Sequence, residues 1–137
     1  MGYRYSFSCS KCGYNQQLYE GWRFMEHSYT VGECLNSPLI RLHYKTREKI
    51  IELSKIHKNL HIETEYQIFR CRHCFQISDK LVVQVFLEDK LLHKTQFKCA
   101  NCQSGLKHTN IHSLKYAICP KCKSNKFRKG KELVLWS

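Results

Sequence analysis

Eight of the nine cysteines form four Cys-x-x-Cys pairs: Cys9/Cys12, Cys71/Cys74, Cys99/Cys102 and Cys119/Cys122. Two thiolates at this spacing can bind one metal ion, and two such pairs complete the tetrahedral set of four ligands that zinc prefers. The four pairs therefore predict two Zn²⁺ ions per chain, with all eight paired cysteines as ligands. The ninth cysteine, Cys34, stands alone, and we expect it to be a small apolar side chain.

The cellular compartment decides whether paired thiols bind metal or form disulfides. The sequence has neither an apolar run of about 20 residues that could cross a bilayer nor an apolar stretch near its start like that of a signal peptide. We therefore expect a cytoplasmic protein with no membrane partner. Catalytic disulfide exchange usually needs one Cys-x-x-Cys pair at the start of a helix. These four pairs lie between strand-like segments instead, which favours metal.

The predicted sites are of a structural kind. A metal ion with four cysteine ligands has no open position for water or substrate, whereas catalytic zinc has three protein ligands and one exchangeable position. We therefore expect no enzymatic activity and no small-molecule substrate. Zinc would instead stabilise short strands that cannot build a large core by themselves.

The spacing of the pairs suggests how they combine. Sixteen residues separate Cys102 from Cys119, which fits a known class of zinc site, so we predict that Cys99, Cys102, Cys119 and Cys122 bind one ion. By exclusion, Cys9/Cys12 would combine with Cys71/Cys74 across 58 residues. Pairing Cys71/Cys74 with Cys99/Cys102, across 24 residues, is the alternative.

The chain is strongly basic, and the positive charge is uneven. Of its 137 residues, 23 are Lys or Arg and 11 are Asp or Glu, a formal net charge of +12. Eight thiolates and two Zn²⁺ ions would reduce this to about +8. Residues 94–137 contain ten Lys/Arg and one acid. Within them we predict phosphate contacts from Lys121, Lys123, Lys126, Arg128, Lys129 and Lys131.

Hydrophobic periodicity predicts mostly strands and one helix. Aromatic and polar residues alternate over 3–8, apolar and polar ones over 61–68, and two further apolar runs, 81–87 and 91–97, predict a hairpin. Apolar residues recur at helical spacing from Ile50, which predicts an amphipathic helix over about 46–60, with Ser37-Pro38 or Thr46 near its start. We expect short strands at 114–118 and 133–136, and irregular structure over 21–37.

At the knuckles the chain resembles the zinc-ribbon, or rubredoxin-like, superfamily. Cys9-x-x-Cys12-Gly13-Tyr14 and Cys119-Pro120-x-Cys122 are closest to its pattern, and the whole chain is similar to small bacterial proteins with tandem Cys-x-x-Cys ribbons. The glycine expected after the second cysteine is replaced by Phe75, Gln103 and Lys123 in the other three knuckles. The resemblance implies a small zinc-dependent α+β fold of two ribbon modules. We expect residues 1–92 to form the first, with the helix inserted, and residues 93–137 the basic second.

Two classes of function follow from this composition. In the first, the basic C-terminal ribbon binds nucleic acid or a nucleic-acid-associated protein. In the second, the protein is an adaptor or inhibitor that docks on a host protein without touching nucleic acid. Its lysine-rich, alanine-poor composition suggests an AT-rich genome, such as that of a low-GC bacterium, its phage or a mobile element.

Overall fold

The computed structural model describes residues 2–21, 28–37, 42–112, 114 and 117–136. The chain forms two compact units, and each consists of segments that are separated in the sequence. We call residues 1–25, 66–81 and 96–137 the ribbon unit, and residues 26–65 and 82–95 the helical unit. This division differs from the expected boundary after residue 92, because two long strands contribute to both units.

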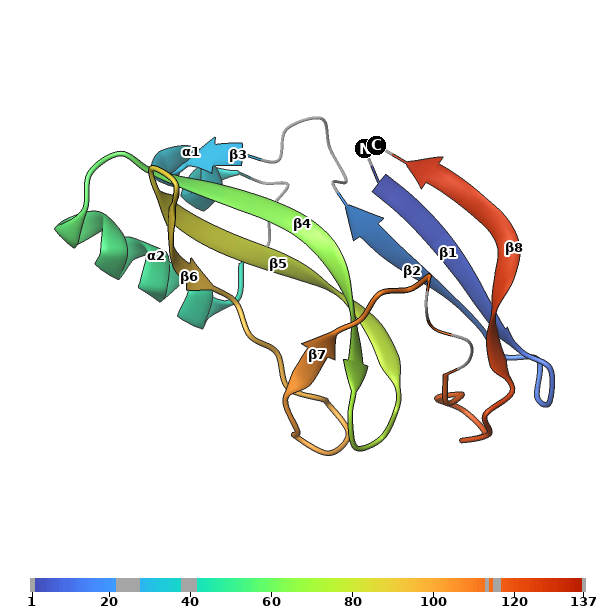
Figure 1. Ribbon diagram of the computed structural model, residues 1–137. Coiled ribbons are helices and arrows are strands. Elements are labelled where there is room, and N and C mark those ends of the chain that lie inside the picture. Colours follow the sequence, from blue (N-terminus) through green and yellow to red (C-terminus); the bar gives the residue numbers. More distant parts are fainter. Residues whose placement is uncertain (1, 22–27, 38–41, 113, 115–116, 137) are drawn as a thin grey trace. The chain divides into compact units, whose positions relative to one another are not determined.

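The ribbon unit is built from antiparallel strands. Its central strand, β1 (Gly2–Cys9), pairs on one side with β2 (Asn15–Gly21) and on the other with β8 (Phe127–Trp136). Gly2 lies opposite Trp136, so the two ends of the chain are side by side (Figure 1). The end of β4 (Leu60–Cys71) pairs with the short β7 (Leu106–His108). The final apolar run, 133–136, belongs to β8 and pairs with β1, so it closes this sheet as predicted.

The alternation predicted over 3–8 is confirmed from Tyr5 onwards, whereas Tyr3 is exposed, and it builds the core of the ribbon unit. Tyr5, Phe7 and Cys9 are buried, while Ser6 and Ser8 between them are exposed. Period-two alternation places one set of side chains on each face of a strand. The buried face packs with Leu18, Ile68, Ile77, Ile111 and Phe127.

The helical unit combines a small sheet with two helices. β3 (Ser28–Thr30) pairs with the first half of β4, and β5 (Ile77–Leu87) forms a hairpin with β6 (Lys90–Lys94). The predicted hairpin is therefore confirmed, but its second strand ends at Lys94 rather than at residue 97. The helices are α1 (Val31–Asn36) and α2 (Tyr44–Ile56), which lie beside these strands in Figure 1. Ile50 and Leu53 of α2 pack with Ile62, Val83 and Val85.

The helix predictions need two corrections. α2 ends at Ile56 rather than near 60, because the chain turns at Asn59 (φ 60°) into β4, and its N-cap is His43 rather than Thr46. The expectation of irregular structure over 21–37 is wrong for 28–36, which form β3 and α1. A capping box between Thr30 and Glu33 starts α1.

Some expectations fall on residues outside the described part of the chain. These are the irregular structure expected over 22–27, the helix start at Pro38 and the middle of the strand expected over 114–118, although Ala117 does pair with Phe127. Among the described residues, no helix is long and apolar enough to cross a membrane.

Candidate metal centres

The eight paired cysteines gather into two sets of four, both within the ribbon unit. We call Cys9, Cys12, Cys119 and Cys122 the outer site, because in the sequence they enclose Cys71, Cys74, Cys99 and Cys102, which we call the inner site. Within each set, all four Sγ atoms lie within 4.8 Å of one another. The structure therefore brings together every cysteine that the sequence predicted as a metal ligand.

The pairing expected from the sequence is wrong. Cys119/Cys122 combine with Cys9/Cys12, not with Cys99/Cys102, and the spacing of 24 residues between Cys74 and Cys99 defines the inner site. The physical reason is strand pairing. Cys9 lies opposite Phe127 in the β1–β8 ladder, which brings the first and last knuckles together, and Cys71 lies opposite Leu106 in the β4–β7 ladder.

All four knuckles have the same backbone conformation. The N–H of the residue after the second cysteine donates to the carbonyl of the first cysteine in every case, at 2.9 Å. That residue has positive φ each time: 79° at Gly13, 61° at Phe75, 63° at Gln103 and 61° at Lys123. The replacement of glycine at three knuckles therefore leaves the turn unchanged, although non-glycine residues adopt this conformation at a cost.

The sulfur geometry fits a tetrahedral thiolate-bound ion. Zinc–sulfur bonds of about 2.3 Å in a regular tetrahedron place the sulfurs about 3.8 Å apart. The Sγ–Sγ distances are 3.6 Å for Cys9–Cys122 and for Cys12–Cys119. In the inner site they are 3.4 Å for Cys71–Cys102 and 3.8 Å for Cys74–Cys99. A disulfide would need about 2.05 Å, so the nine cysteines are free thiols.

Hydrogen-bond donors surround the sulfurs of both sites. The Ser124 hydroxyl lies 3.1 Å from Sγ of Cys122 and 3.6 Å from Sγ of Cys9. In the inner site, Asn101 Nδ2 donates to Sγ of Cys74 at 3.5 Å, and the N–H of Cys74 donates to Sγ of Cys71 at 3.3 Å. Such donors favour the thiolate form, which is the form that binds metal.

The donors act on the pKa values of particular thiols. Burial raises the pKa of Cys9, but hydrogen bonds from Ser124 and from backbone N–H groups outweigh this effect and lower the pKa to about 6. Hydrogen bonds from the side chain and backbone of Ser104 lower the pKa of Cys102 to about 6. Each site therefore contains at least one thiol that ionises below neutral pH, and hydrogen bonds also lower the pKa of Cys99 and of Cys122.

Two other thiols, Cys12 and Cys74, resist ionisation because of burial and of their sulfur neighbours, which raise their pKa values. The backbone N–H of Tyr14 lowers the pKa of Cys12, but burial and the three neighbouring thiols outweigh it and raise the pKa to about 11. A divalent cation between the four sulfurs would compensate this accumulating negative charge, so metal binding must release protons.

The serines were missed in the sequence, although a signal was present. Ser104 and Ser124 both stand two residues after the second cysteine of the last two knuckles, in the pattern Cys-x-x-Cys-x-Ser. The predicted role of Cys34 as a small apolar residue agrees with its burial in the helical unit, where burial raises its pKa to about 11.

Most predicted phosphate-contacting residues lie on the surface of the ribbon unit. The side chains of Lys121, Lys123, Lys126 and Arg128 are exposed. Lys129 is half-buried, with Nζ 5.7 Å from the ring centre of Tyr5, and Lys131 lies on β8.

The fold and the two sulfur sets define a small α+β protein with two sites that could each hold a metal ion, an arrangement consistent with tandem zinc ribbons. Comparison of the chain with protein-family models, with curated proteins and with solved structures finds no match.

Proposed function

We propose that this protein is a non-catalytic zinc-ribbon protein that binds nucleic acid or a nucleoprotein complex through its basic C-terminal residues. Zinc at the outer and inner sites would be structural, since four thiolates complete its coordination. Zinc binding at such sites contributes roughly 10–16 kcal/mol in model peptides, comparable to the stability of a whole domain. The metal would therefore stabilise the surface that carries the basic residues.

The observation that best supports the proposal is the division of charge between the units. The ribbon unit contains 15 Lys/Arg and 3 Asp/Glu, a formal net charge of +12. The helical unit contains 8 of each, a net charge of zero. With two zinc ions bound to eight thiolates, the ribbon unit would keep about +8. A concentration of one sign of charge on one unit attracts a polyanion more strongly than evenly distributed charge does.

Two acids of the ribbon unit, Glu20 and Asp79, have hydrogen-bond partners of their own. Glu20 accepts a hydrogen bond from the Tyr5 hydroxyl at 3.1 Å, and Asp79 accepts one from the N–H of Tyr19 at 2.8 Å. Among the side chains that the structure describes, no carboxylate forms an ion pair with the exposed Lys121, Lys123 or Lys126. The ammonium groups of these three lysines are therefore available for phosphate.

The test compares two triple variants of the zinc-loaded full chain by anisotropy titration against labelled DNA and RNA. Lys123→Gln/Lys126→Gln/Arg128→Gln removes three exposed cations of the ribbon unit. Lys45→Gln/Lys55→Gln/Lys58→Gln removes three exposed cations of the helical unit as the matched control. We expect the first variant to bind more weakly and to lower the slope of log affinity against log salt by up to about three, and the control to resemble the parent.

If both triple variants bind nucleic acid equally weakly, binding depends on the total positive charge of the protein and not on the basic surface of the ribbon unit. No binding of the parent to either polymer at low salt would refute the proposal.

A second candidate function is docking on a protein through the helical unit. α2 exposes several apolar side chains: Tyr44 is 61% exposed, Ile56 68% and Ile51 36%. Retention of a single protein by the parent chain, lost on Ile56→Lys with zinc content unchanged, would support this function.

A further inference from the structure

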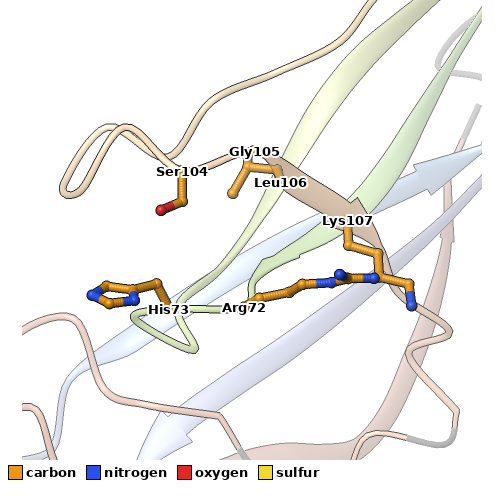
Figure 2. Close-up of a pocket in the computed structure, with 6 residues that line it drawn as sticks. All are labelled: Arg72, His73, Ser104, Gly105, Leu106 and Lys107. Atoms are coloured by element: carbon orange, nitrogen blue, oxygen red, sulfur yellow. The ribbon is translucent and has the colours of Figure 1, made fainter.

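A groove on the ribbon unit carries cations that the sequence-based prediction did not include. Three contiguous pockets form it. The first, of about 590 Å³, lies between the second knuckle and β7 and is lined by Arg72, His73, Ser104, Gly105, Leu106 and Lys107. In Figure 2 the Arg72 side chain extends towards Lys107, while His73 lies at the opposite end, across from Ser104.

The groove continues past this first pocket. A second pocket, of about 330 Å³, shares Arg72 and Lys107 with the first and adds Arg70 and Phe75. A third, of about 230 Å³, shares Arg70 and Phe75 with the second and reaches Asn125. Since Asn125 lies between the exposed Lys123 and Lys126, the groove leads to the basic residues already proposed to contact phosphate.

The cations of the groove lie close together without a compensating acid. Arg70 and Lys107 are direct partners in the β4–β7 ladder. Like charges directly opposite each other in an antiparallel pair are destabilising. Among the residues that the structure describes, no carboxylate forms an ion pair with Arg70, Arg72 or Lys107, and the buried Nε of Arg70 has no hydrogen-bond partner. A bound anion would remove this repulsion.

An exposed aromatic ring lies beside these cations. Phe75 is 45% exposed and occupies the knuckle position where the first knuckle has Gly13, with a φ of 61° that is unfavourable for a phenylalanine. The guanidinium of Arg70 lies 4.9 Å from the centre of its ring. An aromatic ring and a guanidinium plane are the two surfaces on which unpaired bases stack.

We propose that this groove binds single-stranded nucleic acid, with a base stacked on Phe75 beside Arg70 and with phosphates at Arg72 and Lys107. The backbone of the strand would continue past Asn125 towards Lys126. A duplex cannot use the ring in this way because its bases are stacked on one another. This inference rests on the proposed nucleic-acid binding and adds a site and a preference for single strands.

The test measures binding of the zinc-loaded full chain to a labelled 12-nucleotide oligo-dT, an oligo-rU of the same length and a matched duplex. Phe75→Leu removes the aromatic face but keeps an apolar residue at the same backbone position. We expect it to weaken single-strand binding by roughly tenfold or more and to leave duplex binding unchanged. Phe75→Tyr should bind like the parent. Tyr44→Leu, which removes an exposed aromatic ring of the helical unit, is the matched control and should have no effect.

A second variant tests the phosphate contacts separately. Arg72→Gln/Lys107→Gln should weaken single-strand binding and lower its salt slope by about 1.4, since each phosphate contact to a single strand contributes about 0.7. A count of two zinc ions per chain in every variant shows that the fold is retained. If the variant loses affinity for oligo-dT and oligo-rU equally, the groove binds single-stranded DNA and RNA alike. If it loses affinity for one of them alone, that polymer is the preferred ligand.

Several results would overturn the inference. If Phe75→Leu binds oligo-dT and oligo-rU as the parent does, the site is wrong while the proposed function stands. If the parent binds the duplex more tightly than either single strand, the preference is wrong. If it binds none of the three, the proposed function fails as well. Tight binding of an oligoglutamate peptide in place of every oligonucleotide would indicate an acidic protein segment as the ligand.

Discussion

The hydroxyl oxygen of Ser124 lies 3.1 Å from the sulfur of Cys122, and the same oxygen lies 3.6 Å from the sulfur of Cys9. One serine therefore contacts ligands from both ends of the chain. A hydroxyl that donates to a thiolate stabilises the ionised form and orients the ligand. Ser104 has the corresponding position beside Cys102 in the inner site.

Ser124→Ala should weaken metal binding at the outer site by about tenfold, because groups that orient metal ligands typically contribute this much. Losing the hydroxyl also raises the pKa of Cys9, so protons compete with the metal at higher pH. The variant should therefore release one of its two zinc ions at a higher pH than the parent does. A chromophoric chelator followed during a pH titration measures this. Ser8→Ala, an exposed serine next to Cys9, is the control, and identical release curves for the parent and Ser124→Ala would refute the role of the hydroxyl.

Gly13→Ala should lower the free energy of unfolding by about 1 kcal/mol, because φ at this position is 79° and a β-carbon is unfavourable there. No heavy atom lies within 4 Å of the added carbon, so the cost is conformational and not steric. Gly105→Ala has equal space but no positive φ, and it should change stability little. Denaturant unfolding of the zinc-loaded proteins makes the comparison. Equal effects of the two substitutions would contradict the conformational explanation.

Ile50→Ala should destabilise the protein by roughly 2–5 kcal/mol, because its side chain is fully buried in the core of the helical unit. The neighbouring Ile51, which is 36% exposed, provides the matched Ile51→Ala control with a much smaller effect. Both variants should keep two zinc ions per chain, since neither residue belongs to the ribbon unit. Thermal unfolding with elemental analysis checks both statements. Loss of zinc in Ile50→Ala under native conditions would show that the sites depend on this core.

Cys34→Ala should leave the zinc content at two per chain. Cys34 is 1% exposed, and burial raises its pKa to about 11, so the thiol is neutral and enclosed at neutral pH. We also expect it to react with iodoacetamide only after denaturation. Rapid alkylation of Cys34 in the folded, zinc-loaded chain would contradict this assignment.

Local patterns in the sequence predicted local structure well. The alternation of Tyr3 to Ser8 predicted β1, and the spacing of Ile50 and Leu53 predicted α2, because both depend only on which face of an element is buried. The cap at Thr30 and Glu33 was also readable as a T-x-x-E signature, but the short α1 that follows it lacks a long apolar period.

The combination of the knuckles could not be read locally. A Cys-x-x-Cys turn supplies two ligands of a site. The other two come from a second knuckle, and strand pairing determines which knuckle that is. The separation of 16 residues between Cys102 and Cys119 fits the spacing of a known class of zinc site. The pairing of β1 with β8 nevertheless places Cys9, and not Cys102, beside Cys119 and Cys122. The groove was missed for the same reason, because Arg70 and Lys107 become neighbours only through β4 and β7.

The pairing of the knuckles is the central structural claim, and counting zinc in two double variants tests it most directly. Cys12→Ser/Cys119→Ser removes two ligands of the outer site only, so this variant should keep one zinc ion per chain. Cys12→Ser/Cys74→Ser removes one ligand from each site, so it should keep none. Elemental analysis of the reduced, purified proteins gives both counts. The reverse result, with no zinc in the first variant and one ion in the second, would show that Cys9/Cys12 combine with Cys71/Cys74 and would contradict the sites described.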